Sequence, residues 1–139
     1  MSKIIINPYS TDTQQVGVLP KCLVTYYQLP YTTLDVWMPP GVLKHLKKRG
    51  HWEDLLAHHL IIPSAIENPD FAGQNPREPN SLELYKIIDD HLLIAIKMSP
   101  EKDLFLGSFY KLDNGQEKIQ KRLRTGRIHP FDFFLNNTV

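Results

Sequence analysis

The sequence predicts an α+β fold in which helices precede an antiparallel sheet and pack on one face of it. Segments with helical spacing lie together between Val42 and Glu67, and apolar runs typical of strands lie together between Leu84 and Lys111. Separate blocks of helices and strands are typical of α+β folds. The chain has 139 residues, of which 42% are hydrophobic. This is enough for one core, so residues 1–139 are expected to form a single domain.

The N-terminal part is predicted to hold a pair of strands. Residues 1–20 are turn-rich and are expected to be loose, with one possible strand at Lys3–Ile6. Cys22–Gln28 and Thr32–Met38 are rich in β-branched and aromatic residues, which favour strands. Leu29-Pro30-Tyr31 between them is typical of a turn, so the two segments are expected to pair antiparallel.

The helical block follows. A helix is predicted through Val42–Lys48, with Pro40 in its first turn, where the missing N–H costs nothing. A second helix is predicted over Trp52–Ile61 from the helical spacing of its apolar residues. Pro63 is expected to interrupt it, and Ser64–Glu67 has the form of a capping box that starts another short helical turn.

The remainder predicts a meander, a basic helix and a tail. Phe71–Ser81 is expected to be a long polar loop. The meander has three predicted strands, Leu84–Ile88, His91–Met98 and Leu104–Lys111. A helix over Gln116–Thr125 is expected to stop at Gly126. The tail, residues 128–139, is expected to dock as an edge strand or an extended arm.

The charge of the chain is unevenly distributed. The net charge is only +1, but four bases and no acid lie between Gly41 and Gly50, and five bases face one acid in Gln116–Pro130. The middle, Glu53–Asp113, holds eleven acids against five bases. If the fold joins the two basic islands, they would form a site for a polyanion. Two solvated helix faces are the alternative.

Several classes of protein are excluded or disfavoured. The chain has no Gly-rich phosphate loop, paired CxxC, HExxH or GxSxG motif. Cys22 is the single cysteine, Met1–Ser10 does not resemble a signal peptide, and no apolar run approaches the ~20 residues needed to span a bilayer. A cytoplasmic protein without membrane contact is therefore expected.

The histidines are the main candidates for catalytic residues. Four of the six histidines lie within residues 45–59, beside the first basic island. Imidazole exchanges protons near neutral pH, so His45 and His51 are candidates for general acid–base catalysis. His51, Asp54 and His58 share one helical face and would be candidate ligands in a metal-dependent hydrolase.

The meander contributes a second set of polar candidates. Lys97 ends one predicted strand, and Ser108 and Tyr110 share a face of the next. If Lys97 and Ser108-x-Tyr110 lie across from one another, they would present an ammonium group and two hydroxyls on adjacent strands, all able to hold a phosphate oxygen. Snorkelling of Lys97 to water is the alternative.

Several segments together resemble a known family. They are Leu34–His51, which carries His45, Arg49 and His51, then Ile66–Phe71 with its Asn-Pro-Asp-aromatic turn, Leu92–Lys97 and Phe105–Tyr110. In this order they are similar to phage-associated nucleases of the barnase–EndoU–colicin E5/D–RelE-like group (BECR fold). The resemblance covers residues 34–127 as a nuclease-like core. The chain departs from the pattern at Gly50, an additional residue before His51.

The resemblance implies a small endoribonuclease that needs no metal or cofactor and cleaves RNA by attack of the 2′-OH. It implies a toxin or an accessory protein of a phage or mobile element, with a possible antitoxin or immunity protein as partner. The implied catalytic residues are His45, His51, Lys97, Ser108 and Tyr110. The two basic islands supply the expected RNA-binding residues, which are Lys48, Arg49, Arg122, Arg124 and Arg127. A catalytically silent nucleic-acid- or protein-binding domain of the same fold is the alternative.

Overall fold

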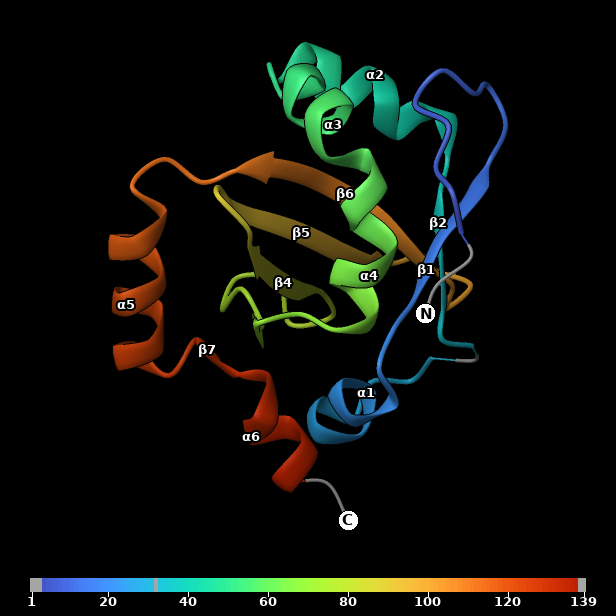
Figure 1. The fold of residues 1–139 in the computed structure, drawn as a ribbon. Coiled ribbons are helices and arrows are strands. Elements are labelled where there is room, and N and C mark those ends of the chain that lie inside the picture. Colours follow the sequence, from blue (N-terminus) through green and yellow to red (C-terminus); the bar gives the residue numbers. More distant parts are fainter. Residues whose placement is uncertain (1–3, 32, 138–139) are drawn as a thin grey trace.

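A seven-stranded sheet forms the centre of the protein in the computed structural model, which describes residues 4–31 and 33–137 (Figure 1). The predicted α+β class is confirmed, with a mostly antiparallel sheet. The helices were expected on one face of the sheet, but they lie on both sides of it, because the second face is apolar as well. In spatial order the strands are β1 (Gln14–Val18), β2 (Asp35–Met38), β6 (Leu104–Lys111), β5 (His91–Met98), β4 (Leu82–Ile87), β3 (Phe71–Gly73) and β7 (Ile128–Pro130).

The N-terminal strand pair exists, but one of its members was predicted wrongly. β2 pairs antiparallel with β1, which lies inside the segment expected to be loose. The prediction for Thr32–Met38 is confirmed from Asp35 onward, and Thr32 lies outside the described residues. Lys3 also lies outside them, and the described residues Ile4–Ile6 form no strand.

The segment predicted as the other strand, Cys22–Gln28, is instead the helix α1 (Lys21–Tyr27). Leu23 is fully buried in the core, and Cys22, Val24 and Tyr27 pack against that core. Burial of this helical face outweighs the strand preference of β-branched and aromatic residues. Gln28 ends the helix in the left-handed conformation, with φ of 53°.

The helical block matches the prediction at its start and differs later. Helix α2 (Pro40–Lys48) has Pro40 in its first turn, as predicted. The second predicted helix divides into α3 (Trp52–His58) and the 3-10 turn η1 (His59–Ile61). The next helix, α4 (Ile62–Glu67), includes Pro63 in its first turn, so this proline starts a helix.

The predicted capping box at Ser64–Glu67 does not form. Since α4 begins two residues before Ser64, the Ser64 hydroxyl lies inside the helix and donates to the Ile61 carbonyl at 3.0 Å. Helix α4 packs on β1 so closely that a Cβ on Gly17 would lie 2.9 Å from Cδ1 of Ile66. The main core lies between this helix and the sheet.

The predicted meander is confirmed as β4, β5 and β6, paired antiparallel in that order. β6 also pairs with β2, in parallel, and this joins the N-terminal strands to the meander. The segment expected to be a polar loop begins with the strand β3, which pairs with β4 on one side and with β7 on the other. Ala72 and Gly73 of this strand are buried. The tail docks as the edge strand β7 and continues as α6 (Phe131–Asn136), a helix that was not predicted.

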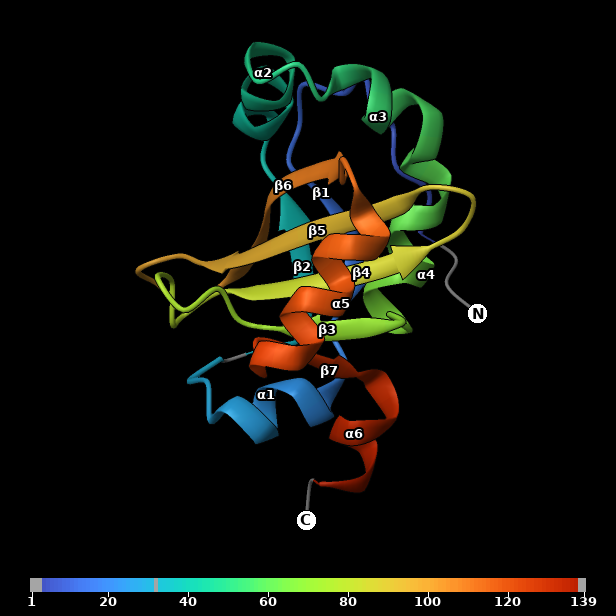
Figure 2. The same ribbon diagram turned by 90° about the vertical axis from the view of Figure 1, so that its left-hand side faces the viewer.

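The basic helix α5 (Gly115–Thr125) lies on the other side of the sheet from α4 (Figure 2). Its residue Ile119 packs in a second, smaller cluster with Tyr85 and Leu93, whereas the neighbouring residues Leu84 and Ile94 belong to the main core. Alternation along β4 and β5 thus gives the sheet two apolar faces. α5 stops at Gly126, whose φ is 80°. Glycine adopts this left-handed conformation readily because it has no side chain.

Candidate active site

The sheet face toward α5, here called the open face, carries polar side chains in a row. Glu83 on β4 lies opposite Ala95 on β5, and Ala95 lies opposite Ser108 on β6. The next row places Tyr85 beside Leu93 and Tyr110. Paired residues point to the same face, so Glu83, Ser108 and both tyrosines project to one side. α5 packs against the tyrosine row and leaves Ala95 and Ser108 half exposed.

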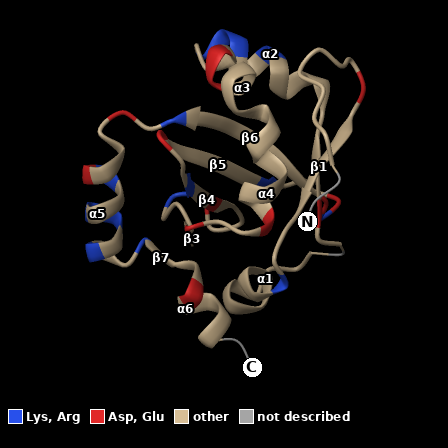
Figure 3. Cartoon of the chain, in the orientation of Figure 1, with Lys and Arg blue, Asp and Glu red and all other residues tan. Residues whose placement is uncertain are grey.

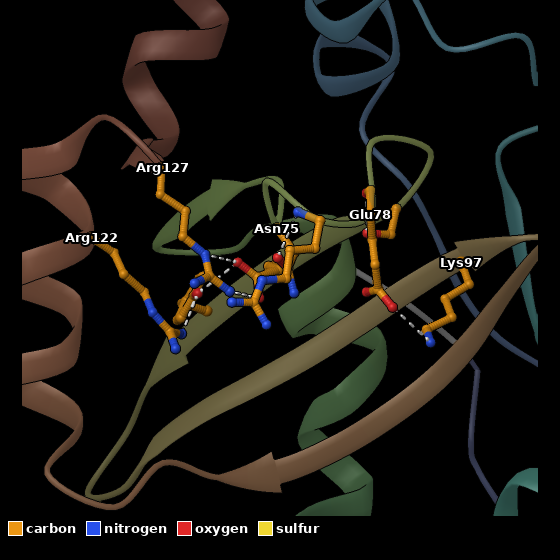
Figure 4. A network of polar contacts seen from close by, with 9 residues as sticks. Asn75, Glu78, Lys97, Arg122 and Arg127 are labelled. Atoms are coloured by element: carbon orange, nitrogen blue, oxygen red, sulfur yellow. Dashed lines mark hydrogen bonds and ion pairs between the residues drawn. The ribbon is translucent and has the colours of Figure 1, made fainter.

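A polar network is centred on Glu83, which is only 7% exposed. Arg127 donates from Nε to Oε1 at 2.9 Å and from Nη2 to Oε2 at 2.7 Å. The Tyr85 hydroxyl donates to Oε1 at 3.0 Å and accepts from Nη1 of Arg122 at 2.7 Å. Figure 4 shows both arginines reaching this point from the α5 side. The carboxylate thus fixes one guanidinium directly and the other through a tyrosine.

These arginines form part of the wall of a cleft of about 690 Å³. The cleft also contains Lys118 and Lys121 of α5, Tyr27 of α1 and part of the loop after β3. Four bases and no acid line it among the described residues. A concave surface lined by one sign of charge concentrates its field and attracts an anion.

Burial keeps the tyrosine hydroxyls of this region protonated. Loss of hydration raises the pKa of Tyr85 well above its usual range, and the charge of Glu83 raises it further. Burial also raises the pKa of Tyr110, and it raises the pKa of Tyr27 to about 12. At neutral pH these side chains are therefore hydrogen-bond donors and not phenolates.

His51 is the predicted catalytic histidine that the structure brings to the open face. Its ring stacks on Tyr110, with ring centres 4.7 Å apart and planes inclined by 20°. Its Nδ1 lies 4.0 Å from Oδ2 of Asp54, which also accepts a hydrogen bond from the backbone N–H of Lys111 at 3.0 Å. Asp54 thus ties the start of α3 to the end of β6 and places the imidazole over the tyrosine.

Lys97 lies farther along the open face, on the strand next to Ser108. Its stem covers Gly107, where a Cβ would lie 2.8 Å from the lysine Cδ. Its ammonium group lies 3.5 Å from Oε1 of Glu78, and both side chains are about half exposed (Figure 4). Lys97, Ser108 and Tyr110 thus lie on adjacent strands and on one face. They do not lie directly across from one another, because Lys97 is opposite Phe105, whereas Ser108 and Tyr110 are opposite Ala95 and Leu93.

The other predicted residues do not join this group. The His45 side chain is exposed on α2 and makes no hydrogen bond, ion pair or ring contact with the described residues. Lys48 and Arg49 are also exposed at the end of α2. Arg124 lines a separate cavity of about 740 Å³ with His91. Figure 3 shows the basic residues of α2 and those of α5 on different parts of the molecule. The two islands therefore form separate surfaces.

The metal-dependent alternative is wrong for the ligands it named. His51 lies near Asp54, but Nε2 of His58 contacts Oδ2 of Asp90 at 3.0 Å. Within residues 4–31 and 33–137, no three or more His, Cys, Asp and Glu side chains are placed to hold a metal ion.

Sequence reasoning missed Glu83. Tyr85 was a candidate for stacking on an unpaired base, but its ring is fully buried and its hydroxyl belongs to the polar network instead. The predicted strand began at Leu84, one residue after Glu83. The alternation of Leu82 and Leu84 with Glu83 and Tyr85 was the available signal, because it places an acid and a hydroxyl on the face opposite the main core. That Arg127 approaches them depends on the return of the chain through α5.

An α+β fold with a basic cleft beside a sheet face is consistent with proteins that act on nucleic acid. A family model described as phage-Barnase-EndoU-ColicinE5/D-RelE like nuclease3 matches residues 15–120. The chain belongs to this family of phage-associated nucleases. Comparison with curated sequences and with solved structures gave no significant match. Among the described helices, none has the length and apolar character required to cross a membrane.

Proposed function

We propose that the protein is an endoribonuclease that cleaves RNA without a metal ion, by attack of a 2′-OH on the adjacent phosphorus. The observation that carries the proposal is the convergence of Glu83, Tyr85, Arg122 and Arg127 beside a cleft with four basic residues. Membership of a nuclease family supports a nucleic acid as substrate.

The reaction needs a proton acceptor, a proton donor and cations. The 2′-oxygen forms a bond to phosphorus, the bond to the 5′-oxygen breaks, and the products are a 2′,3′-cyclic phosphate and a 5′-OH. Arg122 and Arg127 are assigned to the phosphate, where they offset the extra negative charge of the transition state. Lys97 and Ser108 are assigned to phosphate oxygens farther along the same face.

Glu83 is assigned as the acceptor of the 2′-OH proton. Among the described residues, its Oε1 accepts two hydrogen bonds and its Oε2 accepts one. Oε2 therefore keeps a lone pair for the substrate hydroxyl.

His51 is assigned as the donor to the leaving 5′-oxygen, because it is the histidine that stacks on the open face, through Tyr110. The role predicted for His45 depends on RNA that also reaches α2, where Lys48 and Arg49 would contact its backbone.

The deciding experiment is incubation of the purified protein with single-stranded and structured RNA in EDTA. We expect fragments that end in 2′,3′-cyclic phosphate, and no fragments from an Arg127→Gln variant. Intact RNA in EDTA combined with cleavage after addition of manganese would show metal-dependent chemistry. RNA binding without cleavage under any condition would identify a catalytically silent domain. Both results would overturn the proposal.

The proposed biological role is that of a toxin or accessory nuclease of a phage or mobile element. The support is the phage-associated family together with the RNA chemistry proposed for the cleft. Such an enzyme would degrade cytoplasmic RNA and would need an antitoxin or immunity protein in the cell that makes it. Induced expression is expected to stop growth with the unchanged chain and not with Arg127→Gln. Equal growth of both strains at equal protein levels would contradict the toxin role.

A further inference from the structure

Two aromatic side chains outside the polar network lie side by side on the open face. Trp37 of β2 is paired with Phe105 of β6, and Phe105 is paired with Lys97 of β5. Trp37 is 38% exposed although it lies in a strand, and Phe105 is half-buried. Their neighbours Val36 and Leu104 belong to the main core on the opposite face, so this aromatic row faces solvent.

The aromatic row borders a cavity of about 460 Å³. Its wall also contains Pro39 and the turn between β5 and β6, with the exposed acids Glu101 and Asp103. No lysine or arginine lines it among the described residues. The backbone of the turn is fixed by hydrogen bonds between Ser99 and Asp103, and the two carboxylates make no hydrogen bond or ion pair with the described residues.

We propose that this cavity, the aromatic subsite, binds one unpaired nucleobase of the RNA strand on the open face, a few nucleotides from the phosphate that is cleaved. The inference rests on the proposed ribonuclease function and adds a specific contact to it. The flat surface of a base stacks on tryptophan. The N–H groups at the edge of the base can donate hydrogen bonds to carboxylates. A phosphate would be repelled by Glu101 and Asp103, so the charge of the cavity selects the base and not the backbone.

The subsite lies on the same sheet face as the polar network, more than one nucleotide away from it. Lys97 lies two residues from Ala95, about 7 Å along the strand, and Ala95 is flanked by Glu83 and Ser108. Lys97 pairs with Phe105, so it forms the end of the aromatic row that is nearer to Glu83. Trp37 lies three strands from Glu83, about 14 Å across the sheet. An RNA strand that joins the two places would therefore pass Lys97, which can contact a phosphate between them.

Tryptophan fluorescence tests the subsite directly. The chain has two tryptophans, so in a Trp52→Phe variant all tryptophan emission comes from Trp37. Titration with a single-stranded 2′-fluoro RNA, which has no 2′-OH to attack, is expected to quench this emission. The same backbone made of abasic residues is expected to bind with little quenching. This measurement leaves position 37 intact and therefore does not depend on the folding of a Trp37 variant.

A substitution measures the contribution of the stack. Trp37→Leu is expected to weaken binding of the 2′-fluoro RNA by about five- to a hundredfold, the size of one lost base–aromatic stack. Trp37→Phe should restore most of it, and the abasic strand should bind both variants equally. Tyr9→Ala is the control, because Tyr9 is 72% exposed and lies outside the cavity. Circular dichroism verifies the fold of each variant.

The subsite and the ribonuclease function fail in different ways. If RNA is cleaved but Trp37 emission does not respond to the 2′-fluoro strand, the subsite is wrong and the nuclease assignment stands. If the emission is quenched but RNA stays intact, the nuclease assignment is wrong and the subsite stands. Emission that changes with protein concentration and not with the oligonucleotide would assign the cavity to a second copy of the chain and overturn the proposal.

Discussion

Arg127 holds the carboxylate of Glu83 with two hydrogen bonds, of 2.9 and 2.7 Å, across 44 residues of chain. The pair joins the strand β4 to the segment that follows α5. It therefore fixes the position of the basic helix relative to the sheet. Because the carboxylate is almost completely buried, this pair matters more for stability than an exposed pair does.

Glu83→Gln is expected to lower the free energy of unfolding by about 2–3 kcal/mol, because it leaves a guanidinium without its charged partner. It should also reduce RNA cleavage at least about a hundredfold, measured at a temperature where the variant is folded. Glu78→Gln is the matched control, since the Glu78–Lys97 pair is about half exposed. It should change stability by less than about 1 kcal/mol in urea unfolding. Equal losses from the two variants would contradict the special role of Glu83.

His51→Ala is expected to lower the rate of RNA cleavage at least about a hundredfold, the usual size of an acid–base contribution. His45→Ala should lower it less than about tenfold, because its side chain is exposed and has no contact with the open face. Rates are measured with saturating RNA so that binding does not limit them. If the His45 variant is the more damaged of the two, the reaction takes place nearer to α2 than proposed.

Arg122 and Arg124 allow a comparison within one helix. Arg122 donates to the Tyr85 hydroxyl inside the basic cleft, whereas Arg124 lines the separate cavity beside His91. Arg122→Gln is expected to reduce kcat/KM by about tenfold or more, and Arg124→Gln by no more than about threefold. Both remove one positive charge from α5. Similar losses of kcat/KM in the two variants would mean that activity depends on the total charge of the helix and not on the position of Arg122.

Tyr31 carries a buried hydroxyl oxygen without a hydrogen-bond partner in the described structure. A buried hydroxyl without a partner costs free energy. Tyr31→Phe is therefore expected to leave the protein as stable as before, or more stable by up to about 1 kcal/mol, in urea unfolding. Tyr85→Phe is the contrast, because it removes a hydroxyl that both donates and accepts, and it should destabilise the protein. A clear destabilisation by Tyr31→Phe would indicate a partner for this oxygen.

The raised pKa values of two tyrosines predict that the protein loses stability at alkaline pH. Burial raises the pKa of Tyr27 and Tyr31 from the ordinary value of 10.0 to about 12. The folded state therefore holds these protons more tightly than the unfolded state does. The resulting stability is fully present below about pH 10 and is lost as the pH rises toward about 12. Urea midpoints measured from pH 8 to 11.5 should fall only above about pH 10, and a decline that starts at pH 8 would have another cause.

The sequence by itself determined the local elements with strong patterns. The meander over β4 to β6, the basic helix α5 and the start of α2 follow from alternation, charge and proline position, which are properties of adjacent residues. It also determined the two basic islands and the resemblance of the segments to a nuclease family.

Only the tertiary structure decided which distant residues meet. Cys22–Gln28 became a helix because its buried face fits the core, and β1 formed because β2 offered an edge. The separation of the two basic islands and the contact of Arg127 with Glu83 depend on how the chain returns across the sheet. Such contacts are set by packing between segments far apart in the chain, and a local pattern carries no information about that packing.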